Sequence, residues 1–144
     1  MIKDVEDLDV YKRSLVVLKP LGDFVGKIPK SEYHIRHQIM AAGHSVPANI
    51  AEGFAKRRSE KECKRIWEIA LGSSDEVITH LRAVKMRKFL EVLDAEADIL
   101  IAEYKIVSKQ LNNLIIKWKT NEKRGNSMGS FPTKKRNNPL ETKH

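Results

Sequence analysis

Six basic side chains between residues 56 and 65 are the part of this chain best suited to binding a ligand. They are Lys56, Arg57, Arg58, Lys61, Lys64 and Arg65. Guanidinium and ammonium groups bind the phosphates of a nucleic-acid backbone through charge and hydrogen bonds. Phe54 and Trp67 are the only aromatic residues nearby, so recognition should follow backbone charge more than base sequence. The alternative is a solvated charged loop without a partner, because such runs are common on protein surfaces.

Other residues that could form a site are sparse. His34 and His37 stand three apart, but His44 lies two turns further on, so the three or four ligands of a zinc site are lacking. Cys63 has no histidine or aspartate at a spacing typical of a nucleophile, and we expect it to be a small buried hydrophobe. The sequence contains no Gly-rich phosphate loop and no metalloprotease pair. We therefore expect a protein that is not an enzyme and needs no metal or cofactor.

Four helical patterns must position the basic residues. Apolar side chains recur at spacings of three and four, and no run of alternating β-branched residues indicates strands. The predicted helices cover residues 7–26, 32–55, 60–88 and 95–120. Short connections force consecutive helices to run antiparallel, which predicts an all-α, up-down-up-down antiparallel four-helix bundle.

Two prolines interrupt these patterns. Pro20 removes a backbone donor and clashes with the carbonyl four residues back, so we expect a kink or break near Leu18. Pro47 lies four residues after Gly43, where no side chain obstructs its ring, so the second helix should bend there without ending. Pro47 also frees the carbonyl of Gly43, and the polar groups of Ser45 or Asn49 can satisfy it.

Capping residues mark where three of the helices should begin. Ser31 is a suitable N-cap for the second helix. Ser59 followed by Glu62 predicts a capping box, in which each side chain accepts a hydrogen bond from the other residue's backbone. Asp94 is the expected cap of the fourth helix.

Each predicted helix carries one apolar core stripe. In the first helix the stripe is Leu8, Tyr11, Leu15 and Leu18. In the second it is Ile35, Ile39, Gly43, Val46, Ile50 and Phe54. In the third it is Cys63, Trp67, Ala70, Ser74, Val77, Leu81 and Val84. In the fourth it is Leu100, Tyr104, Val107, Leu111, Leu114 and Trp118.

Helices three and four have more apolar residues than one core stripe needs. The surplus consists of Ile66, Ile69, Leu71, Ile78, Ile99, Ile101, Ile106, Ile115 and Ile116. These residues either fill the edges of the core, since monomers expose many single apolar side chains, or form a surface for self-association.

The last part of the chain differs in composition from the rest. Residues 121–144 are rich in Asn, Gly, Ser, Pro and Lys and have too little apolar surface to offset the entropy of ordering. They hold six basic and two acidic residues, which is half of the net charge of +8. We therefore divide the chain into a mildly basic bundle over residues 1–120 and a disordered basic C-terminal tail over residues 121–144.

Composition also bounds the compartment. The longest apolar stretches are too short to cross a bilayer, and residues 1–20 open with acidic side chains where a secretory signal would be basic. A single cysteine excludes an internal disulfide. We expect a cytoplasmic protein with no membrane partner.

Three short segments resemble a known family. Residues 45–53 (SVPANIAEG), followed by Phe54 and the basic loop, are similar to the signature of the bacterial four-helix bundle proteins named for the intervening sequences of 23S ribosomal RNA genes. Residues 8–11 (LDVY) and residues 70–73 (ALGS) with Glu76 are similar to its other recurrent segments. The chain departs from the family where Met40 and Ala41 replace the usual basic residues before the signature, which argues against a nucleic-acid face on the second helix.

This resemblance implies a four-helix bundle that assembles as a homo-oligomer, often a ring-shaped pentamer. It also implies distant kinship with the accessory variability determinant proteins of diversity-generating retroelements, which bind nucleic acid and a reverse transcriptase. With the basic loop, it predicts a non-catalytic homo-oligomeric module that binds RNA or DNA non-specifically and has a nucleic-acid enzyme as a partner. The alternative is a structural or protein-binding scaffold with no nucleic-acid role.

Overall fold

Five α-helices make up most of the protein. A computed structural model describes residues 2–87, 92–120 and 129–130. The helices are α1 (Asp9–Val16), α2 (Leu18–Gly26), α3 (Tyr33–Ala55), α4 (Glu60–Arg87) and α5 (Val92–Lys117), and short 3-10 turns η1 (Val5–Asp7) and η2 (Lys30–Glu32) precede α1 and α3. After α5, strands β1 (Lys119–Thr120) and β2 (Gly129–Ser130) form a two-residue antiparallel pair, which the sequence did not predict.

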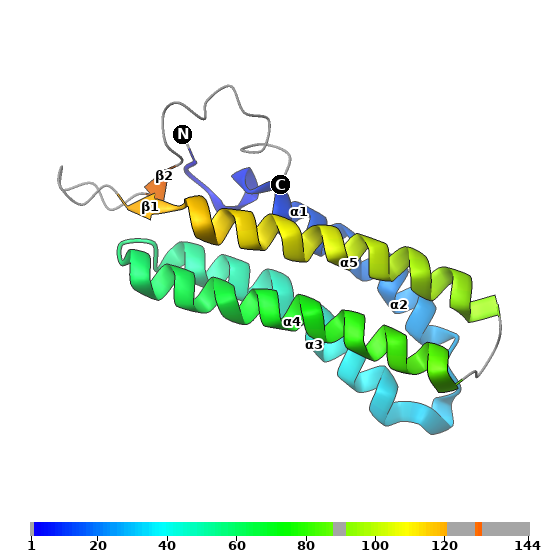
Figure 1. Cartoon of the computed structure of the whole chain (residues 1–144). Helices are drawn as coiled ribbons and strands as arrows, with labels where there is room; N and C mark the ends of the chain where they lie inside the picture. Colours follow the sequence, from blue (N-terminus) through cyan, green and yellow to red (C-terminus); the bar gives the residue numbers. More distant parts are fainter. Residues whose placement is uncertain (1, 88–91, 121–128, 131–144) are drawn as a thin grey trace.

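The helices form an antiparallel bundle. α1 and α2 together make the first leg, and α3, α4 and α5 are the other three (Figure 1). The chain therefore runs up, down, up and down, and the predicted all-α four-helix bundle is confirmed. In the described ranges no helix is long and apolar enough to span a membrane. The predicted disordered tail lies outside the described residues, except for Gly129 and Ser130, which pair with β1.

The first leg breaks at Val17, as Pro20 predicted. The break places Pro20 in the first turn of α2, where a missing backbone N–H costs little because that donor has no partner within the helix. The predicted core stripe of this leg is wrong at Leu15, which is exposed, while Ser14 is buried in its place. The Ser14 hydroxyl donates to the carbonyl of Tyr11 at 2.7 Å, so this buried polar group is satisfied and causes no penalty.

α3 continues through Pro47, as predicted. The side chain of Asn49 does not satisfy the carbonyl of Gly43. It donates instead to the carbonyl and hydroxyl of Ser45, at 2.8 and 2.9 Å. The Ser45 hydroxyl in turn lies 2.9 Å from that of Ser73 on α4, so the polar side chains of the signature connect α3 to α4.

Two predicted helix starts are shifted, one by a single residue and the other by three. Ser31 lies inside η2, and α3 begins after Glu32, whose side chain makes no capping hydrogen bond. α5 begins at Val92, so Asp94 lies in its first turn and is not its cap. An acidic side chain there still favours the helix, because the N-terminus carries the positive end of the helix dipole.

The core stripes of α4 and α5 are confirmed, since every residue predicted on them is buried. Eight of the nine surplus apolar residues divide into two groups, and the ninth, Leu71, is partly buried against the core. Ile66, Ile78, Ile101 and Ile115 are buried at the edges of the core, whereas Ile69, Ile99, Ile106 and Ile116 are exposed. The core-edge interpretation is therefore confirmed for the buried subset, and the self-association interpretation stays a prediction for the exposed one.

Gly53 lets α3 and α4 approach closely. A Cβ atom at Gly53 would lie 2.5 Å from Cδ1 of Trp67 and 3.1 Å from the carbonyl oxygen of Cys63. The Trp67 ring is fully buried against this glycine, and its Nε1 donates to the carbonyl of Ile50 at 3.0 Å. The glycine in the signature segment therefore makes room for a tryptophan.

We predict that Gly53→Ala lowers the free energy of unfolding by about 1–3 kcal/mol, because the new methyl group overlaps the rigid indole. Gly26→Ala is the matched control, since a Cβ atom there meets nothing within 4 Å, and it should stay within about 0.5 kcal/mol. Urea unfolding followed by circular dichroism compares the two variants. Equal stability of the two would contradict the close approach at Gly53.

Candidate nucleic-acid interface

A cluster of buried aromatic rings closes the end of the bundle where α3 turns into α4. Trp118, the residue after α5, packs edge-on against Trp67, with ring centroids 5.1 Å apart, and against Phe54 at 6.3 Å. The cluster ties the ends of α3, α4 and α5 together. It fixes the position of the basic turn that lies between α3 and α4 (Figure 1).

Arg57 belongs to this structural cluster more than to the surface. Its guanidinium carbon lies 4.1 Å from the centroid of the Phe54 ring, and its Nη1 donates to the Phe54 carbonyl at 3.0 Å. The side chain thus stacks on an aromatic face and satisfies a carbonyl in the last turn of α3. Arg57 is therefore less available for phosphate than the sequence predicted.

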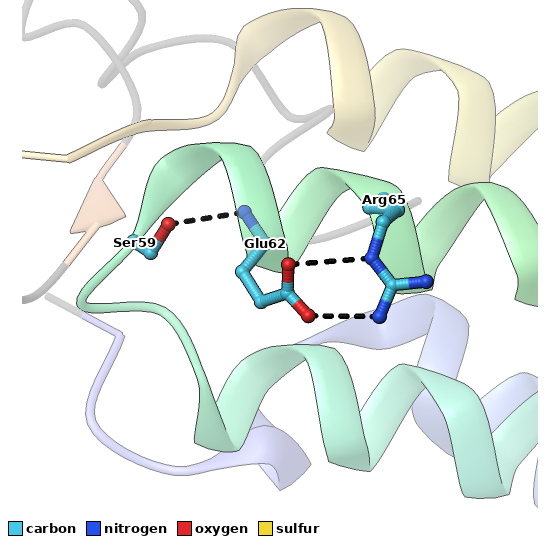
Figure 2. Close-up of polar contacts among 3 residues, drawn as sticks. All are labelled: Ser59, Glu62 and Arg65. Atoms are coloured by element: carbon cyan, nitrogen blue, oxygen red, sulfur yellow. Dashed lines mark hydrogen bonds and ion pairs between the residues drawn. The ribbon is translucent and has the colours of Figure 1, made fainter.

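Ser59, Glu62 and Arg65 form the start of α4 (Figure 2). The backbone N–H of Glu62 donates to the Ser59 hydroxyl at 3.1 Å, which is one half of the predicted capping box. The other half is absent among the described contacts, because the Glu62 carboxylate accepts two hydrogen bonds from Arg65, at 2.8 and 3.3 Å. Ser59 N–H donates to the Lys56 carbonyl instead.

This pairing also changes how Glu62 titrates. The hydrogen bond from Arg65, assisted by the charges of Lys56 and Lys61, holds the pKa of the Glu62 carboxyl below its usual value. The Glu62 carboxylate therefore stays ionised at neutral pH and neutralises Arg65. Lys64 is neutralised in the same way by Glu60, at 3.2 Å.

Three of the six predicted residues have no ion-pair partner among the described residues. Lys56, Arg58 and Lys61 are exposed, and none forms an ion pair with a residue in the described ranges. The structure brings all six predicted residues together at one end of the bundle. Arg57, Lys64 and Arg65 have partners there, so the surface is less positive than the sequence suggests.

Two lysines that the sequence analysis missed lie at the same end. Lys117 and Lys119 flank Trp118, whose ring packs on Trp67 and Phe54. Neither lysine forms an ion pair with any residue that the structure describes, and Lys119 is exposed. The sequence already predicted Trp118 as the last core residue of the fourth helix. Antiparallel packing places the end of that helix beside the start of the third helix, so the position of Lys117 and Lys119 could have been predicted. We call Lys56, Arg58, Lys61, Lys117 and Lys119 the basic end.

Charge is distributed differently at the opposite end of the bundle. Three cations there form ion pairs between different elements, namely Lys27 with Glu96, Lys85 with Asp98 and Arg87 with Glu32. Lys30 and Arg36 make no ion pair within the described part of the chain. Of the two ends of the bundle, the basic end therefore has more cations without a described acidic partner.

The acidic turn η1 limits the positive surface on one side, because η1 contacts α3. Its carboxylates bind their own backbone: Asp7 accepts hydrogen bonds from the N–H groups of Lys3 and Asp4, and Asp4 accepts one from Glu6. The two N–H groups lower the pKa of the Asp7 carboxyl. The Asp7 carboxylate is therefore ionised at neutral pH, and among the described residues no ion pair joins η1 to the basic end.

The other candidate residues form no site. Cys63 is fully buried, and burial raises the pKa of its thiol to about 12. In the described ranges, no group of three or more His, Cys, Asp or Glu side chains is arranged to hold a metal ion. His34 instead lies beside the ring of Tyr33, with centroids 4.3 Å apart.

We predict that Arg57→Ala and Arg58→Ala differ in stability although they remove the same charge. Loss of Arg57 removes the stacking and the hydrogen bond to Phe54 and should cost about 1–2 kcal/mol. Loss of the exposed Arg58 should cost no more than about 0.5 kcal/mol. Chemical denaturation measures both, and equal costs would contradict the structural role of Arg57.

We also predict that native Cys63 reacts with a thiol reagent at neutral pH at least about a hundredfold more slowly than the unfolded chain, because the reactive thiolate is suppressed by burial. The reaction rate with and without denaturant is the measurement. A native rate close to the unfolded one would show that Cys63 is accessible.

Comparisons with known proteins agree with this architecture. The family model described as the 23S rRNA-intervening sequence protein matches residues 6–113. No curated protein sequence matches the chain. A crystal structure of a protein with unknown function from the S23 ribosomal protein family of Bacteroides thetaiotaomicron has a similar fold, with a TM-score of 0.63 and 23% sequence identity over 74% of this chain and 97% of that one. Because the family model covers most of the bundle, this chain belongs to the 23S rRNA-intervening sequence protein family.

Proposed function

We propose that this protein is a non-catalytic, homo-oligomeric module that binds RNA or DNA through its basic end. The observation that supports this proposal best is the set of five cations there without a described ion-pair partner. Cations that neutralise phosphates release counterions from the nucleic acid, and this release drives binding without base recognition.

The buried state of the aromatic rings favours binding to the backbone. Trp67 and Trp118 are fully buried and Phe54 is nearly so. Proteins that stack bases need exposed aromatic faces, and these three rings are already used to hold the helices together. Recognition at the basic end should therefore be insensitive to base identity.

Assembly would strengthen this weak, charge-based contact. A cyclic homo-oligomer, such as the pentamer implied by the family, repeats the basic end once per subunit, so several weak contacts act together on one strand. The basic segment 121–144 adds further positive charge. In the cytoplasm, such an assembly could present nucleic acid to a partner enzyme.

The exposed isoleucines also favour a second candidate function. Ile69, Ile99, Ile106 and Ile116 could pack against helices of a different protein, and the chain would then be a scaffold whose positive charge serves solubility. Salt-dependent binding of nucleic acid distinguishes the two functions, because a scaffold needs none.

We predict that replacing Lys56, Arg58 and Lys61 together with glutamine weakens binding of a generic single-stranded RNA at least about tenfold at low salt. If each cation neutralises one phosphate, the slope of log affinity against log salt should fall by about 2. Fluorescence anisotropy of a labelled RNA between about 50 and 200 mM salt measures both quantities.

The matched control is the replacement of Lys19, Lys30 and Arg36 with glutamine, which removes the same charge away from the basic end. This variant should retain most of the affinity and nearly all of the salt slope. Undetectable binding by the unmodified protein at low salt, binding without salt dependence, or equal losses in the two variants would each refute the proposal.

A further inference from the structure

A second stripe runs along the exposed side of α4, opposite its core stripe. It consists of Arg65, Ile69, Gly72, Glu76, Thr79 and Ala83, all exposed, at alternating spacings of four and three. This spacing keeps one face of a helix against a neighbouring helix. Within one copy of the chain, no described helix packs on this face.

α5 carries a similar exposed stripe. It consists of the exposed Ile99, Ala102, Ile106, Lys109 and Ile116 and the partly buried Asn113, again at spacings of three and four. The three isoleucines are 69%, 42% and 61% exposed, which is far more than a core position allows. Both helices therefore have one stripe for the core and one that faces outward.

No contact within a single copy of the chain explains why residue 72 is a glycine. It lies in the middle of α4 and is exposed, and a Cβ atom there would meet nothing within 4 Å. A glycine inside a helix is less favourable than alanine, because its backbone loses more conformational freedom on folding. Close approach of another backbone is a common reason for such a residue, and Ile69 beside it is 46% exposed.

The two stripes complement each other in size and in charge. The α4 stripe has small residues at Gly72, Thr79 and Ala83, whereas the α5 stripe has isoleucines. Glu68 and Glu76 on α4 form no ion pair with a described lysine or arginine, and the described partner of Glu76 is His80, one turn further along the same helix. On α5, Lys105 and Lys109 likewise have no described acidic partner.

We infer that the α4 stripe of one copy packs against the α5 stripe of the next copy. The inference rests on the proposed homo-oligomer and specifies its interface. Two different faces that fit each other give a heterologous contact, and such contacts close into rings when the rotation between copies allows it. Two α5 stripes packed together would instead bring Lys109 to the contact with no acidic side chain on either stripe.

Contacts inside one copy set the register of this interface. Asp75 accepts a hydrogen bond from Ser108, and Lys85 pairs with Asp98, so these residues lie at matching heights along α4 and α5. Rotation about an axis parallel to the bundle preserves height. Counting from these pairs, Lys109 of one copy lies within about two residues in height of Glu76 of the next, and Ile116 lies within about two residues of Ile69.

Charge reversal on the full-length chain tests this pairing. Sedimentation equilibrium should show an oligomer for the unmodified protein. Glu76→Lys and Lys109→Glu should each weaken association about tenfold or more, because like charges then meet. The double variant carrying both changes should restore association. Circular dichroism of each variant confirms that the helices are intact.

Ile106→Lys places a charge in the α5 stripe, and Val16→Lys is its matched control. Val16 is exposed on α1 and lies outside both stripes. Only Ile106→Lys should dissociate the oligomer. An oligomer unaffected by Ile106→Lys and both charge reversals would refute this interface but leave the proposed oligomer standing. A double variant that stays dissociated would refute the Lys109–Glu76 pairing, and a monomeric unmodified chain would refute the oligomer itself.

Discussion

Trp67 packs directly on the backbone of Gly53, and the arrangement of three helices depends on this contact. No side chain fits at Gly53, because a Cβ atom there would overlap the indole at 2.5 Å. The ring is held by its hydrogen bond to Ile50 and is covered by Trp118, the residue after α5. Since the contact joins α3 to α4 and α4 to α5, it fixes where the turn between α3 and α4 lies and which of its side chains face water.

The charge pattern at this end follows from that packing. Arg57 is drawn onto Phe54, and Arg65 is held by the carboxylate that starts α4, so neither is as free as its position in the sequence suggests. Their neighbours Lys56, Arg58 and Lys61 remain exposed, and Trp118 brings Lys117 and Lys119 to the same end. The positive surface is thus assembled from two distant segments by a buried aromatic cluster. A contact that stabilises the fold also positions the residues we propose for function.

Much of the bundle could be predicted from the sequence, because long helices with regular apolar spacing bury the side that the spacing indicates. The stripes containing Trp67 and Trp118 are examples. Errors arose where two local interactions compete for the same group. Glu62 binds Arg65 and does not complete the capping box, and the buried stripe of the first leg includes a serine that hydrogen-bonds its own backbone. Of the site, the sequence located the basic turn. The ion pairs of Lys64 and Arg65 join residues three and four apart on one helix and could have been predicted, whereas the contribution of α5 depends on tertiary packing.

Lysine footprinting tests the central claim most directly. The protein is acylated with and without saturating single-stranded RNA at low salt, and the modified lysines are identified by mass spectrometry. The account predicts that RNA protects Lys56, Lys61 and Lys119, while Lys19 and Lys30 react as before. Protection of Lys19 and Lys30 with none at the basic end would contradict it.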